Sequence, residues 1–246
     1  MEDMVLSAAQ KSLRVNLDSN IYGSFAEVGA GQETVRQFFR AGGASGTIAK
    51  AMSAYDKDFS DAIYGLEDDG RYVTESRLRK MIHHEYSLLE DRLHREKYPN
   101  KRYFAFANTV ATINFTKTFK GHGWLGIRYQ TSADKSPNEV ILHVRLHEND
   151  PKHQQETIGN IGVNLIYGAN FLYKEPKELL HSLYDGIDRT AIELDLINFS
   201  GPDFVDVDDR LMSLQLIKNG VEVVRLVLPA LDLDVGRRLH ALLELR

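Results

Sequence analysis

The sequence predicts an α+β fold in which helices pack on a mostly antiparallel sheet. Three observations support this class. Apolar residues at helical spacing dominate before residue 100, alternating apolar residues dominate the middle of the chain, and both patterns occur in the last part. We therefore expect a mainly helical region over 1–100 and an α+β region over 101–246, which together form one compact domain.

Two stretches before residue 100 have helical spacing. Residues 32–55 carry apolar residues at this spacing on either side of a glycine-rich centre at 41–46. Because glycine is unfavourable inside a helix, this stretch predicts either two helices joined by a turn or a single helix packed closely against another backbone. Residues 74–97 predict one helix with Thr74 as its N-cap, ended by Pro99.

Three strands follow, over 102–113, 123–131 and 139–147. The first is rich in aromatic and β-branched residues, and the other two alternate between apolar and polar residues. The polar loop 132–138 predicts that the second and third strands form an antiparallel hairpin. This hairpin is the expected centre of the sheet, with one face buried and the other partly open.

The last part of the chain mixes helices and strands. We expect a helix over 152–173, a short helix after Pro176 and a strand over 191–199. Residues 210–220 are ambiguous, but Asn219-Gly220 favours a strand, a tight turn and a second strand. An amphipathic helix is expected over 234–246.

Composition excludes several functional classes. The chain has 246 residues, 30 Lys plus Arg against 35 Asp plus Glu, a net charge of −5 and no cysteine. The missing cysteines exclude disulfides, thiol catalysis and cysteine-bound zinc, and the mild acidity argues against a nucleic-acid partner. The N-terminus does not read as a secretory signal, and no apolar run is long enough to span a membrane. We expect a soluble cytoplasmic protein with no membrane partner, and the sequence indicates no particular cofactor.

The outward face of the central hairpin is the main candidate binding site. Residues i and i+2 of a strand share a face, so His143 and Arg145 point the same way, as do Arg128 and Gln130 on the preceding strand. Two guanidinium groups with imidazole and amide donors suit a phosphate or carboxylate, and Gly126 would admit a ligand close to the backbone. The alternative is a solvated sheet face whose cations pair with acidic residues across the strands.

Two residues are candidates for acid–base chemistry. His122 lies between Gly121 and Gly123, where it could act as a general base, although a glycine turn before a strand explains the same pattern. Glu85 follows His84 in the helix over 74–97 and could join a composite site. The alternative is that His84 is an ordinary surface or core residue.

Three weaker motifs carry little chemistry. Gly29-Ala30-Gly31 lacks the third glycine of a dinucleotide-binding turn and no strand is expected before it. The glycines of 42–47 lack the lysine of a P-loop, so close helix packing is the favoured interpretation. Asp206, Asp208 and Asp209 could hold Mg²⁺, but a solvated loop is the default, and we predict no metal site.

Four stretches, at 24–65, 122–131, 158–171 and 198–216, carry a family resemblance. The chain resembles a family of uncharacterised bacterial proteins often labelled nicotinamide-nucleotide adenylyltransferase or TonB-box protein. The HxGH motif with which such adenylyltransferases bind a triphosphate is absent here. The family also continues past the point where this chain ends, so the resemblance implies that a C-terminal part is missing.

The sequence thus predicts a protein that binds a small anionic ligand, with a nucleotide as the leading candidate. Arg128, Gln130, His143 and Arg145 would bind it, and His122 or Glu85 would supply acid–base function. The alternative is a non-catalytic homo-oligomer or assembly protein, in which the helices over 32–55 and 152–173 pack against a second copy or a partner through small residues such as Gly159 and Gly162.

Overall fold

The computed structural model describes residues 5–216, which form an α+β fold around one six-stranded sheet of order β2-β1-β3-β4-β5-β6. Strand β1 pairs in parallel with β2 and β3, and the remaining pairs are antiparallel. The predicted α+β class is therefore confirmed, with a sheet that is mixed. The strands are β1 (Ile21–Gly29), β2 (Ile48–Ala54), β3 (Arg102–Ala111), β4 (His122–Tyr129), β5 (Asn138–Leu146) and β6 (Ile192–Ser200).

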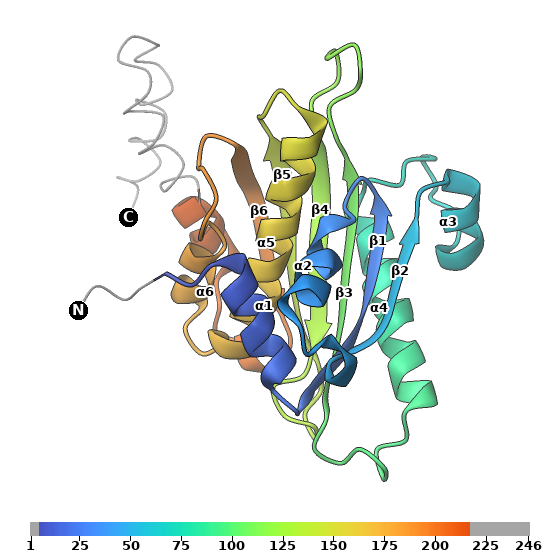
Figure 1. Ribbon diagram of the computed structural model, residues 1–246, viewed down its shortest axis with the longest axis vertical. Coiled ribbons are helices and arrows are strands. Elements are labelled where there is room, and N and C mark those ends of the chain that lie inside the picture. Colours follow the sequence, from blue (N-terminus) through green and yellow to red (C-terminus); the bar gives the residue numbers. More distant parts are fainter. Residues whose placement is uncertain (1–4, 217–246) are drawn as a thin grey trace.

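Helices cover the two faces of the sheet unequally. Helices α1, α2, α5 and α6 lie on one face, and α4 lies on the other (Figure 1). Within residues 5–216, no helix is long and apolar enough to cross a membrane. The helices are α1 (Ala8–Leu17), α2 (Glu33–Ala41), α3 (Lys57–Tyr64), α4 (Glu75–Arg92), α5 (Pro151–Phe171) and α6 (Pro176–Ser182), with short 3₁₀ turns η1 (Ala44–Gly46) and η2 (Pro202–Phe204).

The central hairpin divides its side chains between two cores. Leu125 and Leu142 pair across β4 and β5 and belong to the main core, which α5 covers. Ile141 points to the other face and packs with Leu78 of α4. A Cβ atom added at Gly126 would lie 3.0 Å from Leu78 Cδ2, so helix α4 fills the space that the sequence interpretation reserved for a ligand.

The glycines of α5 serve packing inside the chain. A Cβ atom at Gly159 would lie 2.8 Å from Glu33 Cβ, and one at Gly162 would lie 2.3 Å from Thr34 Oγ1. Helix α2 therefore covers the slim side of α5. The prediction that these glycines form an interface with a second copy is wrong, because a neighbouring helix of the same chain already occupies that side.

Strands β1 and β2 were missed by the sequence analysis. Gly42 and Gly43 adopt positive φ angles of 85° and 73°, which end α2 where any other residue would be strained. The chain then continues through η1 into β2, so the predicted helical continuation over 48–55 is wrong. Ile48 and Met52 fit a helix by spacing, but parallel pairing with β1 overrides that local preference.

The other expected elements can be compared up to residue 216. The helices expected over 74–97 and 152–173 are α4 and α5, and the Thr74 hydroxyl caps α4 by accepting the Arg77 N–H at 3.1 Å. The ambiguous segment is helical over 209–216. The turn at Asn219-Gly220 and the helix expected over 234–246 lie outside the described residues.

Candidate functional site

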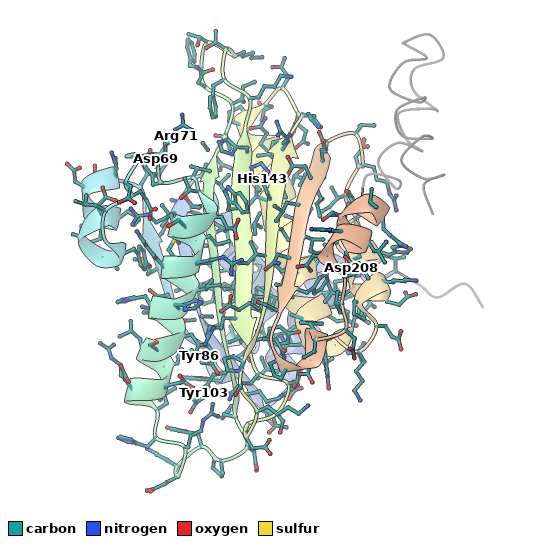
Figure 2. The ribbon with its side chains drawn as sticks, turned by 180° about the vertical axis from the view of Figure 1, so that it is seen from behind. Asp69, Arg71, Tyr86, Tyr103, His143 and Asp208 are labelled. Carbon is teal, nitrogen blue, oxygen red and sulfur yellow. The ribbon has the colours of Figure 1, made fainter. Side chains whose placement is uncertain are left out.

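The sheet face that carries α4 is only partly covered by helices. Helix α4 packs on β1, β3 and β4, and Figure 2 shows His143 on the sheet beside the N-terminal end of α4, away from Tyr86 and Tyr103. A hollow of about 580 Å³ lies here, within the size range of small-molecule sites. It is lined by Lys120, Gly121, His122, His143, Arg145, Leu146, His147, Glu193 and Asp195.

The strand register decides which predicted residues meet. His122 lies opposite Arg145, and Trp124 lies opposite His143. Arg128 lies opposite Glu139, near the other end of the hairpin. The structure therefore brings together His122, His143 and Arg145, whereas the prediction that Arg128 and Gln130 lie beside them is wrong. The spacing of each strand fixes the face of a side chain but not its partner along the pair.

A chain of hydrogen bonds runs along the wall of the hollow. His143 Nδ1 lies 2.5 Å from Asp195 Oδ1, and His143 Nε2 lies 3.2 Å from His122 Nδ1. The second carboxylate oxygen of Asp195 accepts a hydrogen bond from Arg145 Nε at 2.6 Å. The ring centroids of Trp124 and His143 are 4.7 Å apart, so the indole also packs against the imidazole.

Asp195 is the residue of this cluster that the sequence analysis missed. It lies in β6 where the pairing with β5 shifts, so that His143 faces Leu196 and Val144 faces Leu194. Alternation with Ile192 and Leu194 places Asp195 on the same face as Glu193, and the shift decides which residues of β5 it meets. The available signal was the alternation of Glu193 and Asp195 with apolar residues in β6.

The charges of the cluster shift two pKa values downward. Burial lowers the pKa of His122, and the neighbouring His143 and Arg145 lower it further, while Asp195 acts in the opposite direction. Burial raises the pKa of Asp195, but hydrogen bonds and charge from His143 and Arg145 outweigh burial, and the net pKa is lowered. At neutral pH the cluster therefore contains an ionised Asp195 and a neutral His122.

The rim of the hollow offers free hydrogen-bond donors. Asp195 is paired with Arg145, and Glu193 Oε2 lies 3.3 Å from His147 Nε2. Arg145 uses Nε for its pair, so its terminal amino groups make no hydrogen bond to another residue of 5–216. Lys120 is exposed and forms neither a hydrogen bond nor an ion pair with that part of the chain.

Arg128 is neutralised inside the molecule. Glu139 accepts a hydrogen bond from Arg128, and its carboxylate also lies 3.2 Å from Arg79 Nη1 and 2.7 Å from His83 Nε2. The Arg128 guanidinium lies 5.2 Å from the centre of the Tyr86 ring. Cross-strand pairing with an acidic residue, the alternative interpretation of this sheet face, is what the structure shows for Arg128.

Gln130 has structural contacts at the end of the sheet. Its side-chain oxygen accepts the Tyr103 N–H at 3.2 Å and a hydrogen bond from Arg95, while its amide nitrogen donates to the Lys135 carbonyl at 2.8 Å. Gln130 is buried and does not line the hollow.

Glu85 is buried between α4, α3 and β2. Its carboxylate lies 2.5 Å from Lys50 Nζ and 3.0 Å from the Tyr64 hydroxyl. These partners come from other elements than those of the hollow, and Glu85 does not line it. The structure therefore does not bring Glu85 and His122 into one site.

The glycine turn at 29–31 does follow a strand and precede a helix, but its anion-binding groups are occupied. Glu27 Oε1 accepts the N–H groups of Thr34 and Val35 at 3.0 and 3.3 Å, at the start of α2. Burial raises the pKa of Glu27 to about 7, against the opposing effect of these hydrogen bonds. A phosphate would have to displace the protein's own carboxylate there.

The acidic cluster after residue 205 also has internal partners. Asp208 Oδ1 accepts the Arg210 N–H at 2.9 Å, and Asp209 accepts hydrogen bonds from Asn198 and Phe199 at 2.5 and 2.8 Å. Within residues 5–216, no group of three or more His, Cys, Asp or Glu side chains is arranged to hold a metal ion.

Comparison with known proteins finds similarity at the level of solved structures. The chain is similar to a competence-damaged protein (CinA) superfamily protein from Enterobacter cloacae, with 10% identity, a TM-score of 0.46, and 68% of this chain and 94% of that chain covered. A competence/damage-inducible protein, CihA, from Agrobacterium tumefaciens has 17% identity and a TM-score of 0.42, with 73% and 99% covered. A competence or damage-inducible protein from Enterobacter asburiae has 8% identity and a TM-score of 0.46, with 67% of this chain and 98% of that chain covered.

The expected family resemblance is corrected by these comparisons. No family model matches the chain, and neither does any curated protein. The solved structures named above are described as CinA or competence-damage proteins, and not as nicotinamide-nucleotide adenylyltransferases or TonB-box proteins. The resemblance to a family with those labels is therefore wrong.

Proposed function

We propose that the protein binds a small anionic ligand in the hollow between the end of β4 and strands β5 and β6, with a nucleotide phosphate as the first ligand to test. The observation that carries the proposal is that the acidic groups of the hollow are paired within the chain, whereas some of its basic groups are not. Both carboxylates that line the hollow face basic partners within the chain, whereas Lys120 has no partner in residues 5–216 and Arg145 keeps its terminal amino groups free.

The chemistry of these donors supports an anion. The two terminal amino groups of a guanidinium can donate hydrogen bonds to two oxygens of one phosphate or carboxylate. The ammonium group of a lysine adds a positive charge. His122 supplies a hydrogen-bonding group on the same wall. Arg128, which the sequence suggested for this role, has no part in the proposal because Glu139 already neutralises it.

A thermal-shift titration tests the proposal with inorganic phosphate, ATP, NMN and NAD as probes. A ligand present at about 100 times its Kd should add about 2.7 kcal/mol to stability and raise the melting temperature by several degrees. We expect Lys120→Ala with Arg145→Ala to abolish the shift. Lys117→Ala is the matched control, because Lys117 is an exposed lysine of the same loop that does not line the hollow.

Two outcomes would overturn the proposal. One is the absence of a shift with each of the four probes. The other is a shift that survives in the Lys120→Ala/Arg145→Ala variant, which would place the ligand elsewhere on the molecule.

The alternative of a homo-oligomeric assembly protein has no comparable support in the described residues. Its proposed contact residues, Gly159 and Gly162, face Glu33 and Thr34 of the same chain. A stable oligomer remains testable by light scattering, but it would have to use another surface.

A further inference from the structure

The hydrogen-bond chain in the hollow has a direction. Asp195 is an acceptor at neutral pH, because its pKa is lowered, so His143 must carry its proton on Nδ1. In a neutral His143 the other ring nitrogen, Nε2, is then an acceptor. With this form of His143, His122 Nδ1 is the donor across the 3.2 Å contact.

In this arrangement His122 carries its own proton on Nδ1. With its proton on Nδ1, neutral His122 has an unprotonated Nε2, which is the atom a general base needs. A proton taken up at Nε2 makes an imidazolium whose Nδ1–H is held by His143, and the carboxylate of Asp195 stabilises the positive charge through that ring. Here a second imidazole, His143, lies between the carboxylate and the base, whereas in the Ser-His-Asp arrangement the carboxylate contacts the base directly.

The surroundings keep His122 unprotonated at rest. The titratable and charged groups that face it are His143 and Arg145 of β5 and Asp195 of β6, with Lys120 on the adjoining loop. The Phe119 ring lies 5.8 Å from the His122 ring on the loop side. Burial and the nearby cations disfavour the imidazolium, so the base is available near neutral pH.

We infer that His122 is a general base that activates water for the hydrolysis of a small phosphate ester, with His143 and Asp195 as positioning residues. This inference rests on the proposed anion site, which supplies the phosphate-binding donors Lys120 and Arg145. No serine, threonine or cysteine is among the residues that line the hollow, and the nucleophile of the inferred reaction is water.

The reaction balances without a further reactant. Nε2 of His122 removes a proton from water while the water oxygen forms a bond to phosphorus. The bond from phosphorus to the ester oxygen breaks on the opposite side, the departing alkoxide takes a proton from solvent, and the imidazolium gives its proton back to solvent. The products are an alcohol and inorganic phosphate, and the histidine is regenerated as the neutral tautomer.

The test follows hydrolysis of p-nitrophenyl phosphate and phosphate release from AMP by the purified protein between pH 5 and 9. We expect kcat/KM to rise with pH as His122 loses its proton and then to level off. His122→Gln should lower kcat at least about 100-fold while phosphate binding, read by thermal shift, persists. Lys117→Ala should behave like the wild type.

The positioning role has its own readout. Asp195→Asn should lower kcat about 10-fold or more and move the rising limb of the pH profile to lower pH, because removal of the carboxylate charge lowers the pKa of His122. A purely structural role for Asp195 would lower stability without moving that limb.

Three results would overturn the inference. Equal rates for the wild type and His122→Gln would exclude the base. Turnover that EDTA abolishes and Zn²⁺ restores would mean that the two facing imidazole nitrogens hold a metal. Phosphate binding without turnover would leave the proposed anion site intact and refute the hydrolysis alone, whereas a loss of both would refute both.

Discussion

The two ends of the β4–β5 hairpin carry similar residues on the same sheet face, but only one end lines the hollow that contains His122, His143 and Arg145. At one end Arg128 meets a buried carboxylate, Glu139, which also contacts Arg79 and His83. At the other end Arg145 meets Asp195 and leaves its terminal amino groups free. The difference shows that a pair of arginines on a sheet face becomes a candidate site only where the protein does not itself supply enough anions.

Removal of Glu139 should produce the largest difference in stability between the two ends of the hairpin. Glu139→Ala should cost about 2 kcal/mol of stability, because it removes the common carboxylate of Arg128, Arg79 and His83, whose side chains are 26%, 36% and 53% exposed. Urea unfolding followed by circular dichroism measures the effect. Glu193→Ala at the open end is the control, and it should change stability by less than about 1 kcal/mol since its carboxylate is exposed.

The two arginines provide a matched pair with opposite expectations. Arg128→Ala should cost about 1–2 kcal/mol of stability and leave phosphate binding unchanged, because its charge lies in a partly buried pair over Tyr86. Arg145→Ala should cost less than about 1 kcal/mol, because its side chain is 58% exposed, yet it should weaken phosphate binding. If phosphate binding were weakened in Arg128→Ala and not in Arg145→Ala, the ligand site would lie at the Arg128 end of the hairpin instead.

The sequence was sufficient to predict the hairpin and its faces. The alternation of Leu125 and Ile127 with polar neighbours identified β4, and that of Val140 and Leu142 identified β5. Both faces follow from the two-residue period of a strand alone. The register does not, because it depends on the geometry of the connecting loop and on long-range packing.

The same limit explains the site residues that the sequence could not assign. His122, His143 and Arg145 were singled out and do meet, but Arg128 and Gln130 were placed beside them although they lie at the other end of the hairpin. Asp195 reaches His143 through an irregular pairing of β5 and β6, which no local pattern encodes. Strand β2 was read as a helix because Ile48 and Met52 have a spacing of four, and only pairing with β1 identifies the segment as a strand.

Acidification should affect the open end through His122. Its pKa in the folded protein is below the ordinary value, so between these two pKa values the unfolded chain binds more protons, and stability falls as the pH is lowered. Glu27, whose pKa is raised to about 7, acts in the opposite sense, because the folded protein binds the extra proton. The difference between wild type and His122→Gln isolates the histidine.

We expect the variant to lose less stability than the wild type when the pH falls from 7.5 to 5, as measured by urea unfolding at each pH. Glu27 is present in both proteins and its contribution cancels in the difference. An identical dependence in the two proteins would show that His122 titrates alike in the folded and unfolded states, and that the hollow does not disfavour its charge.

The smallest expected effect is a change in the pKa of His122 when Arg145 is replaced. Arg145 lowers that pKa directly, and it also shares the Asp195 carboxylate, which acts to raise it. Arg145→Gln removes a positive charge and leaves Asp195 less neutralised, so both consequences raise the pKa of His122. Nuclear magnetic resonance titration of the histidine Cε1 protons measures the change.

Arg128→Gln is the control for this titration, because it removes the same charge from the closed end of the hairpin, where Glu139 is the partner. Its effect on His122 should be weak, since solvent and salt screen charges that lie far apart on the surface. Equal changes in the pKa of His122 in the two variants would mean that charges at both ends of the hairpin act on His122 alike. A shift from Arg145 alone would establish that His122, His143, Arg145 and Asp195 titrate as a separate cluster.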